Sequence, residues 1–139
     1  MRLGTRMVGI LAILLTVSAC ATTPMTDPEK YNLDDQLERV MAIDNFHMVG
    51  WNRVDTQSFI LQTNSNEFYL VVLNVPSYQL SFAENITVNT SGSRVRAGNS
   101  SVVVYGENTD NTFLIDKLYK FKDAGQIQTI VEQIRGDFK

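Results

Sequence analysis

Residues 67–74, with the sequence EFYLVVLN, decide the fold that the sequence predicts, because this stretch is apolar on both faces. Successive side chains of a strand point to opposite sides. Two apolar sets therefore alternate here: Phe68, Leu70 and Val72 on one side, and Tyr69, Val71 and Leu73 on the other. A short apolar run between the turn residues 64–66 and Pro76 is typical of a strand buried on both faces. We expect it at the centre of a sheet, with other elements packed on either side.

Working outward, a period of two predicts further strands on both sides of this stretch. The expected strands are residues 46–53, 57–63, 86–90, 94–97, 101–105 and 112–121. The strand at 101–105 carries apolar residues on both faces, like the central one. Residues 77–84 are ambiguous, and we expect a short helical turn that buries Leu80 and Phe82. Short strands separated by turns every eight to twelve residues predict a small antiparallel sheet or a partly closed barrel.

Two helices are expected to cover the sheet. The first spans residues 32–43, where Asn32 is a plausible N-cap and one apolar face comprises Leu33, Leu37, Val40 and Met41. The second follows Asp123, which is expected to cap it with Gln126 as capping-box partner. Its apolar stripe consists of Ile127, Ile130, Val131 and Ile134, and Gly136 stands where a helix-ending glycine belongs. The predicted class is α+β, with a short N-terminal helix and a C-terminal amphipathic helix.

The N-terminus predicts a lipoprotein signal peptide over residues 1–19. Arg2 and Arg6 precede an apolar run at 7–17, and Val17-Ser18-Ala19-Cys20 forms a lipobox around the only cysteine in the chain. The run is shorter than the roughly 20 residues that span a bilayer. We expect cleavage before Cys20 and lipidation of that cysteine. The rival prediction is ordinary secretion with cleavage after Ala21, which would discard the cysteine.

The rest of the chain is expected to be a tethered domain. Residues 20–32, which include two prolines, form the lipidated cysteine and its tether, and residues 33–139 form a single periplasmic domain. In the bacterial lipoproteins that this start resembles, Asp after the cysteine favours the inner membrane. Ala21 stands there instead, so the resemblance implies the outer membrane, facing the periplasm. The partners implied are the membrane, through the lipid, and an envelope protein.

Net charge and cysteine content narrow the range of partners and the sources of stability. Cleavage before Cys20 leaves ten basic and fifteen acidic residues, a net charge of −5. This acidic balance argues against nucleic acid as a partner. With its one thiol lipidated, the mature chain forms no internal disulfide, so its stability is expected to come from packing.

The sequence indicates neither catalysis nor a cofactor. His47, the only histidine, alternates with Val49 and Trp51, which suggests one strand face, and no nucleophile motif accompanies it. Asp34, Asp35 and Asp44 lie near His47 in sequence but match no metal-ligand spacing. Residues 107–111 are too short for a calcium loop and are expected to form a hairpin loop. We therefore expect no catalytic residues, no metal and no cofactor.

A basic and aromatic surface is the remaining candidate for binding. Arg94 and Arg96 fall on the same face of one predicted strand, and Lys117, Lys120 and Lys122 cluster near the last strand. Such a patch would bind a carboxylate or phosphate, although a solvated face whose charges protect a sheet edge is the favoured interpretation. Trp51 and Tyr69 would line a pocket or belong to the core. The candidate binding residues are Arg94, Arg96, Trp51 and His47.

Several segments together resemble a family of small proteobacterial lipoproteins of unknown function. The resemblance rests on 46–51 (FHMVGW), 69–71 (YLV), 80–86 (LSFAENI), 94–98 (RVRAG) and 102–104 (VVV). It implies a cysteine pair near the positions of Ser77 and Phe113 in many members, and this chain has neither. The resemblance brings no activity and no catalytic residues.

Three functional hypotheses remain open. The first is a non-enzymatic outer-membrane lipoprotein that binds or supports another envelope component. The second is a small-ligand or peptide-binding periplasmic module that uses the basic and aromatic surface. The third is an enzyme that uses His47. A pocket lined by Arg94, Arg96 and the nearby aromatic residues would favour the binding module, whereas burial of His47 with no carboxylate or hydroxyl in reach would rule out the enzyme.

Overall fold

A computed structural model describes residues 29–64 and 66–136 of the chain. The predictions for the signal peptide, for Cys20 and for most of the tether lie outside these described residues. Within them the chain forms nine strands, one short 3₁₀ helix and one α-helix. The strands are β1 (Glu38–Val40), β2 (Ala42–Ile43), β3 (Met48–Arg53), β4 (Ser58–Thr63), β5 (Phe68–Leu73), β6 (Ile86–Asn89), β7 (Val95–Arg96), β8 (Ser101–Tyr105) and β9 (Asp110–Lys120). The helices are η1 (Tyr78–Ser81) and α1 (Ala124–Arg135).

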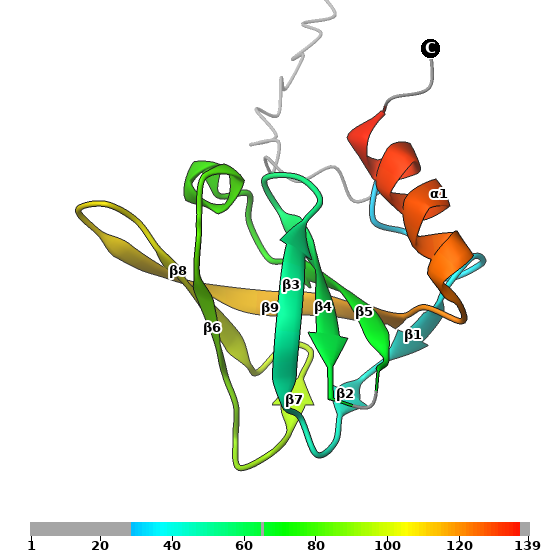
Figure 1. Cartoon of the computed structure of the whole chain (residues 1–139), viewed down its shortest axis with the longest axis horizontal. Coiled ribbons are helices and arrows are strands. Elements are labelled where there is room, and N and C mark those ends of the chain that lie inside the picture. The colour runs from blue at the N-terminus through cyan, green and yellow to red at the C-terminus, as the bar shows by residue number, and fades with distance from the viewer. Residues whose placement is uncertain (1–28, 65, 137–139) are drawn as a thin grey trace, which may run out of the picture.

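The main sheet is antiparallel and has seven strands in the order β3-β4-β5-β9-β8-β6, with β1 also paired to β9. Its organising strand is β9, which is 11 residues long. The first half of β9 pairs with β8, and the second half pairs with β5 on one side and with β1 on the other. β2 and β7 form a separate two-stranded sheet beside the main one (Figure 1). Because β9 changes partners along its length, the sheet curls into a half-barrel.

The two ends of the sheet, β3 and β6, face each other across an unpaired seam, which isolated hydrogen bonds bridge. Near one end, the Arg53 guanidinium donates to the carbonyl oxygens of Ser81 and Ala83, just before β6. Near the other end, the Phe46 N–H donates to the Ser93 carbonyl over 2.7 Å. The predicted α+β class with a partly closed antiparallel barrel is therefore confirmed.

β5 is buried on both faces, as its sequence predicts. Tyr69, Val71 and Leu73 point into the core of the half-barrel. Leu70 and Val72 point outward into a second core, where Ile130 and Ile134 of α1 cover them. β5 lies between β4 and β9, so both of its edges are also paired. A strand in this position has no solvated face, which explains its continuous apolar sequence.

The C-terminal helix is confirmed together with its caps. The Asp123 side chain accepts a hydrogen bond of 3.0 Å from the Gln126 N–H, and the Gln126 side chain accepts one from the Lys122 N–H. Gly136 ends the helix with φ of 68°, a conformation that favours glycine. Ile130 and Ile134 are buried, so the apolar stripe contacts the sheet as expected.

The predicted helix over residues 32–43 is wrong, because this segment forms a turn and then β1 and β2. Leu33 and Leu37 are buried in the second core, between the sheet and α1, as expected, but Val40 packs against the half-barrel core instead. Met41 is 68% exposed at the break between the two strands. β1 pairs with the edge of β9 that β8 leaves free, and these hydrogen bonds outweigh the weak local preference for helix.

Candidate functional site

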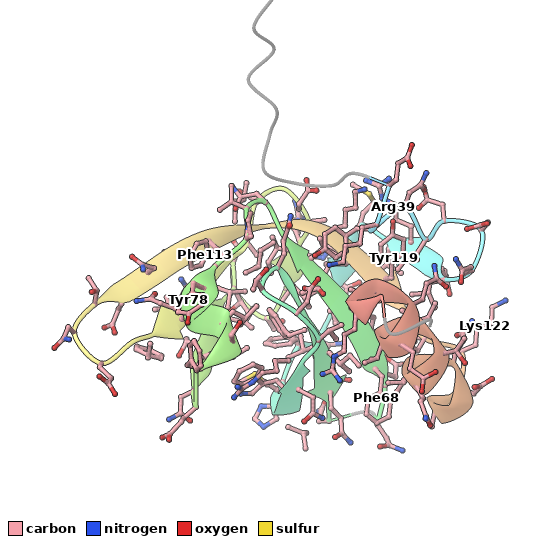
Figure 2. The ribbon with its side chains drawn as sticks, turned by 90° about the horizontal axis from the view of Figure 1, so that it is seen from above. Arg39, Phe68, Tyr78, Phe113, Tyr119 and Lys122 are labelled. Atoms are coloured by element: carbon pink, nitrogen blue, oxygen red, sulfur yellow. The ribbon has the colours of Figure 1, made fainter. Side chains whose placement is uncertain are left out.

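A surface hollow of about 660 Å³ lies between η1, the start of β6 and the β8–β9 hairpin. We call it the aromatic pocket. Its lining residues are Tyr78, Gln79, Phe82, Glu84, Asn85, Tyr105, Gly106 and Glu107. Its volume falls within the usual range for ligand pockets, about 300–1,000 Å³. Figure 2 shows Tyr78 at the opposite end of the molecule from Arg39 and Lys122.

The first wall of the aromatic pocket comes from η1. Leu80 is fully buried and holds this short helix against the half-barrel core. The rings of Tyr78 and Phe82, four residues apart, meet edge to face with centroids 4.9 Å apart. Tyr78 is 76% exposed and Phe82 is 65% exposed. The predicted turn and the burial of Leu80 are thus confirmed, whereas the predicted burial of Phe82 is wrong. The helix turns Phe82 away from Leu80, toward the solvent and Tyr78.

The second wall comes from the β8–β9 hairpin. Tyr105 ends β8, and its hydroxyl forms a hydrogen bond of 2.9 Å with the Thr87 hydroxyl on β6. Tyr105 is exposed because Val102 and Val104 take the inward positions of the strand. The expected second apolar face of residues 101–105 is therefore only partly covered. Loop residues 106–109 form the expected hairpin turn, closed by a hydrogen bond from the Gly106 N–H to the Thr109 carbonyl.

Gln79 fixes the two walls to each other. Its side-chain amide donates a hydrogen bond of 3.1 Å to the Thr109 carbonyl and accepts one of 2.5 Å from Asn111. Gly106 allows this close approach, because a Cβ atom there would lie 2.6 Å from the Gln79 amide nitrogen. The aromatic rings therefore stand on a scaffold whose parts are hydrogen-bonded together before any ligand arrives.

The aromatic pocket carries negative charge. Glu84 and Glu107 belong to its lining, and no lysine, arginine or histidine does. Both carboxylates are exposed. Within residues 29–64 and 66–136, neither side chain forms a hydrogen bond or an ion pair. The pocket thus combines three exposed aromatic rings with two carboxylates that have no cation of their own.

A second hollow, of about 580 Å³, lies between the free edge of β3 and α1. Its lining residues are Trp51, Asn52, Arg53, Ile60, Ala83, Glu84, Ile127, Val131 and Arg135. Both arginines already have partners: Arg53 donates to the carbonyls before β6, and Arg135 donates to the carbonyls of Val54 and Arg53. These guanidinium groups hold the seam and the helix end together, so this hollow is the weaker candidate for a binding site.

The structure does not gather the binding residues that the sequence suggests into one hollow. Trp51 lines the second hollow, and its ring packs edge to face on Phe59 with centroids 5.9 Å apart. Arg94 and Arg96 line neither hollow. His47 is exposed, and its side chain forms no hydrogen bond or ion pair with the described residues.

His47, Val49 and Trp51 do not share a strand face, contrary to the expected alternation. β3 has a bulge between Met48 and Gly50, which pair with the adjacent residues Thr63 and Gln62. The extra residue, Val49, is 58% exposed, while Met48 and Trp51 both pack against the core. An inserted residue breaks the period of two, so residues after the bulge lie on the opposite face from the one that simple alternation predicts.

Two of the five cations in the predicted basic patch, Arg94 and Lys120, form ion pairs with local carboxylates. Arg94 pairs with Asp44, and this hydrogen bond lowers the pKa of the Asp44 carboxyl and raises that of Arg94. The Lys120 ammonium lies 3.1 Å from the Glu67 carboxylate. The hydrogen bond from the Tyr69 hydroxyl lowers the pKa of Glu67, and Lys120 adds to that effect. These arrangements are those of a solvated, paired surface.

Among the residues that the structure describes, no three His, Cys, Asp or Glu side chains come close enough to hold a metal ion. The same part of the chain contains no helix of the length and apolarity needed to cross a membrane.

The aromatic pocket is thus assembled from residues that the sequence analysis did not select. Tyr78, Phe82 and Tyr105 sit in patterns typical of core residues. The available signal is the spacing of Tyr78 and Phe82 around Leu80, since three apolar side chains on a single short turn cannot all point inward. Glu84 and Glu107 are 23 positions apart in sequence, so their proximity depends on the pairing of β6 with β8.

These features define a small α+β protein with a curled antiparallel half-barrel and a surface pocket lined by aromatic and acidic residues. The chain belongs to a family of unknown function (DUF6491), whose model matches residues 4–137. No curated protein and no solved structure matches the chain.

Proposed function

We propose that this chain is an outer-membrane-anchored lipoprotein whose periplasmic domain binds another envelope component without catalysing a reaction. The observation that carries the binding role is the aromatic pocket. Large apolar rings are costly to leave in water, and contiguous exposed ones mark interaction sites on soluble domains. Here three such rings line one hollow, and the scaffold beneath them is fixed by Gln79.

The anchor in this proposal rests on the N-terminal sequence. Arg2, Arg6 and the apolar run precede the lipobox, and Cys20 stands at the position that lipidation requires. Each buried CH₂ of an acyl chain contributes about 0.8 kcal/mol, so two or more chains hold a protein stably at a membrane. Ala21 supports the outer membrane, through the resemblance to bacterial lipoproteins.

The anchor is tested by the intact mass of the protein from its native host, together with its partition between sucrose-gradient membrane fractions. We expect a triacylated mass that begins at Cys20, in the outer-membrane fraction. A Cys20→Ala variant should stay unprocessed or leave that fraction. A soluble product that begins after Ala21 would refute the anchor.

The binding role is tested by photo-crosslinking in the same cells. A benzophenone amino acid replaces Phe82 in the aromatic pocket, and the matched control carries it at Val49, which is similarly exposed but lines neither hollow. We expect one discrete crosslinked envelope component from position 82 and none from position 49. Equal labelling from both positions, or from neither, would contradict a binding role for the pocket.

A further inference from the structure

We infer that the aromatic pocket receives an arginine side chain of a partner protein. This inference rests on the proposed binding function and specifies the chemistry of the partner at the same site. The charge of the pocket supplies the first argument. Glu84 and Glu107 form no ion pair with the described residues, and no basic residue lines the hollow, although Glu84 also borders the second hollow, which Arg53 and Arg135 line. A negative surface attracts a positive group and disfavours acidic or phosphate-bearing ligands.

The rings supply the second argument. A cation over an aromatic face is attracted by the ring quadrupole. Tyr78, Phe82 and Tyr105 offer three rings beside two carboxylates. A basic side chain entering here has aromatic surface for its stem and head, and anionic oxygen atoms for its N–H groups. The lining amides of Gln79 and Asn85 add neutral polar groups to the same wall.

The openness of the site favours a side chain carried by a protein over a free small cation. A single exposed cation–π contact is weak, so a lone organic cation would bind only at high concentration. Tyr78 and Phe82 are 76% and 65% exposed, and a small ion would leave most of that surface in water. A polypeptide segment covers it, and its interface adds the contacts that the cation lacks.

Arginine fits this lining better than lysine does. The guanidinium group is planar, stacks on aromatic rings and donates two parallel hydrogen bonds to a carboxylate. It is also less strongly hydrated than an ammonium group, so transfer into a half-open hollow costs less. Tyrosine and arginine are accordingly enriched where protein interfaces concentrate their binding energy.

The test uses the full-length protein, purified from host membranes in detergent, and saturation-transfer NMR of short peptides. The probe is acetyl-Gly-Ser-Arg-Ser-Gly-amide. Its matched control carries citrulline, the neutral isostere of arginine, and a third peptide carries lysine. We expect saturation of the arginine side chain to exceed that of citrulline by about fivefold. The lysine peptide should fall between the two.

Variants of exposed residues test whether the arginine peptide binds at the aromatic pocket. Phe82→Ala and the double change Glu84→Gln with Glu107→Gln should each reduce the arginine signal by roughly threefold or more. Glu38→Gln is the control for charge, because Glu38 lies on β1, beside the far end of β9 from the hairpin. It should leave the signal unchanged.

Equal signals from the arginine and citrulline peptides, a stronger lysine signal, or no effect of the pocket variants would overturn the inference. The crosslink from position 82 separates this failure from failure of the proposed function. If position 82 still captures an envelope component while the arginine peptide does not bind, binding at the pocket stands and the arginine assignment falls. If both are absent, both proposals fall.

Discussion

The hydroxyl of Tyr31 donates a hydrogen bond of 2.6 Å to the carboxylate of Asp55, 24 residues away. The Lys30 ammonium lies 2.7 Å from the same carboxylate oxygen. The other oxygen of Asp55 accepts from the backbone of Gln57 and Ser58 and from the Ser58 hydroxyl. Asp55 therefore joins the start of the described chain to the β3–β4 turn.

This relationship predicts a specific loss of stability in acid. Burial by itself raises the pKa of Asp55, but its hydrogen bonds outweigh burial and lower the pKa below the ordinary value of 3.8. A carboxyl whose pKa is lowered by folding stabilises the fold at pH above its ordinary value. That contribution disappears as the pH falls through the lowered pKa. We expect urea unfolding curves to show this loss below about pH 4.

Asp55→Asn should remove this acid-dependent contribution and cost about 1–3 kcal/mol at neutral pH, where charge-assisted hydrogen bonds are lost. Asp35→Asn is the matched control, since Asp35 is exposed in the turn before β1. The unfolding free energies of the two variants are compared from pH 7 to pH 3. If the wild type and Asp55→Asn differ equally at all these pH values, the linkage is absent.

Tyr119 makes a second connection to the N-terminal segment. Its buried hydroxyl donates to the Tyr31 carbonyl over 2.8 Å and accepts from the Leu33 N–H over 3.3 Å. Burial raises the pKa of this phenol. Tyr119→Phe removes both bonds at nearly constant volume, and we expect a loss of about 1–3 kcal/mol in urea denaturation. Tyr78→Phe, at an exposed position, should change stability by less than about 0.5 kcal/mol. Equal effects of the two changes would show that the hydroxyl bonds of Tyr119 contribute nothing.

Arg53 closes the seam between β3 and β6 at one end, through two carbonyl groups. Arg53→Met keeps much of the stem but removes the donors, and we expect a loss of about 1 kcal/mol. Amide hydrogen exchange should accelerate in β6, because its outer edge lacks a ladder partner. Arg39→Met, which breaks only an exposed pair with Asp34 away from the seam, serves as the control. Unchanged exchange in β6 would mean that the seam does not depend on Arg53.

Gly106 is predicted to control the shape of the aromatic pocket. A Cβ atom there would lie 2.6 Å from the Gln79 amide and 2.6 Å from the Thr109 carbonyl oxygen. Gly106→Ala therefore forces the hairpin away from η1, at a cost of about 1–3 kcal/mol. Crosslinking from position 82 should fall with it. Gly50→Ala is the control, because its Cβ would meet only the Gln62 side chain at 3.9 Å. Full crosslinking in Gly106→Ala would show that the hydrogen bonds of Gln79 to the hairpin do not control the shape of the pocket.

Much of the fold is predictable from local pattern. Residues 68–73 are apolar on both faces, and a run of this length between turn residues is typical of a strand covered on both sides. Asp123 and Gly136 mark the two ends of α1 by backbone chemistry that neighbouring residues alone determine. The order of the strands along the chain follows from the period of two and from the turn residues between them.

The candidate site was not predictable in this way. Phe82 has the same apolar character as Leu80, and only the contact of η1 with the half-barrel decides which of the two is buried. The side of β3 on which Trp51 lies depends on the single extra residue of the bulge, and no unusual sequence marks that bulge. Arg94 forms an ion pair with Asp44, 50 residues away, and no local pattern predicts that contact.

The sequence by itself therefore determined the class of fold, the central strand β5 and the capped helix α1. Lipid attachment at Cys20 stays a prediction, because that residue lies outside the part of the chain that the structure describes. Only the tertiary structure decided that residues 38–40 and 42–43 are strands, since pairing with β9 and with β7 supplies hydrogen bonds that a helix would forgo. It also decided that Tyr78, Phe82 and Tyr105 meet at one hollow. Propensities and caps act over a few residues, whereas strand pairing and close packing act between residues far apart in the chain, and no local pattern encodes them.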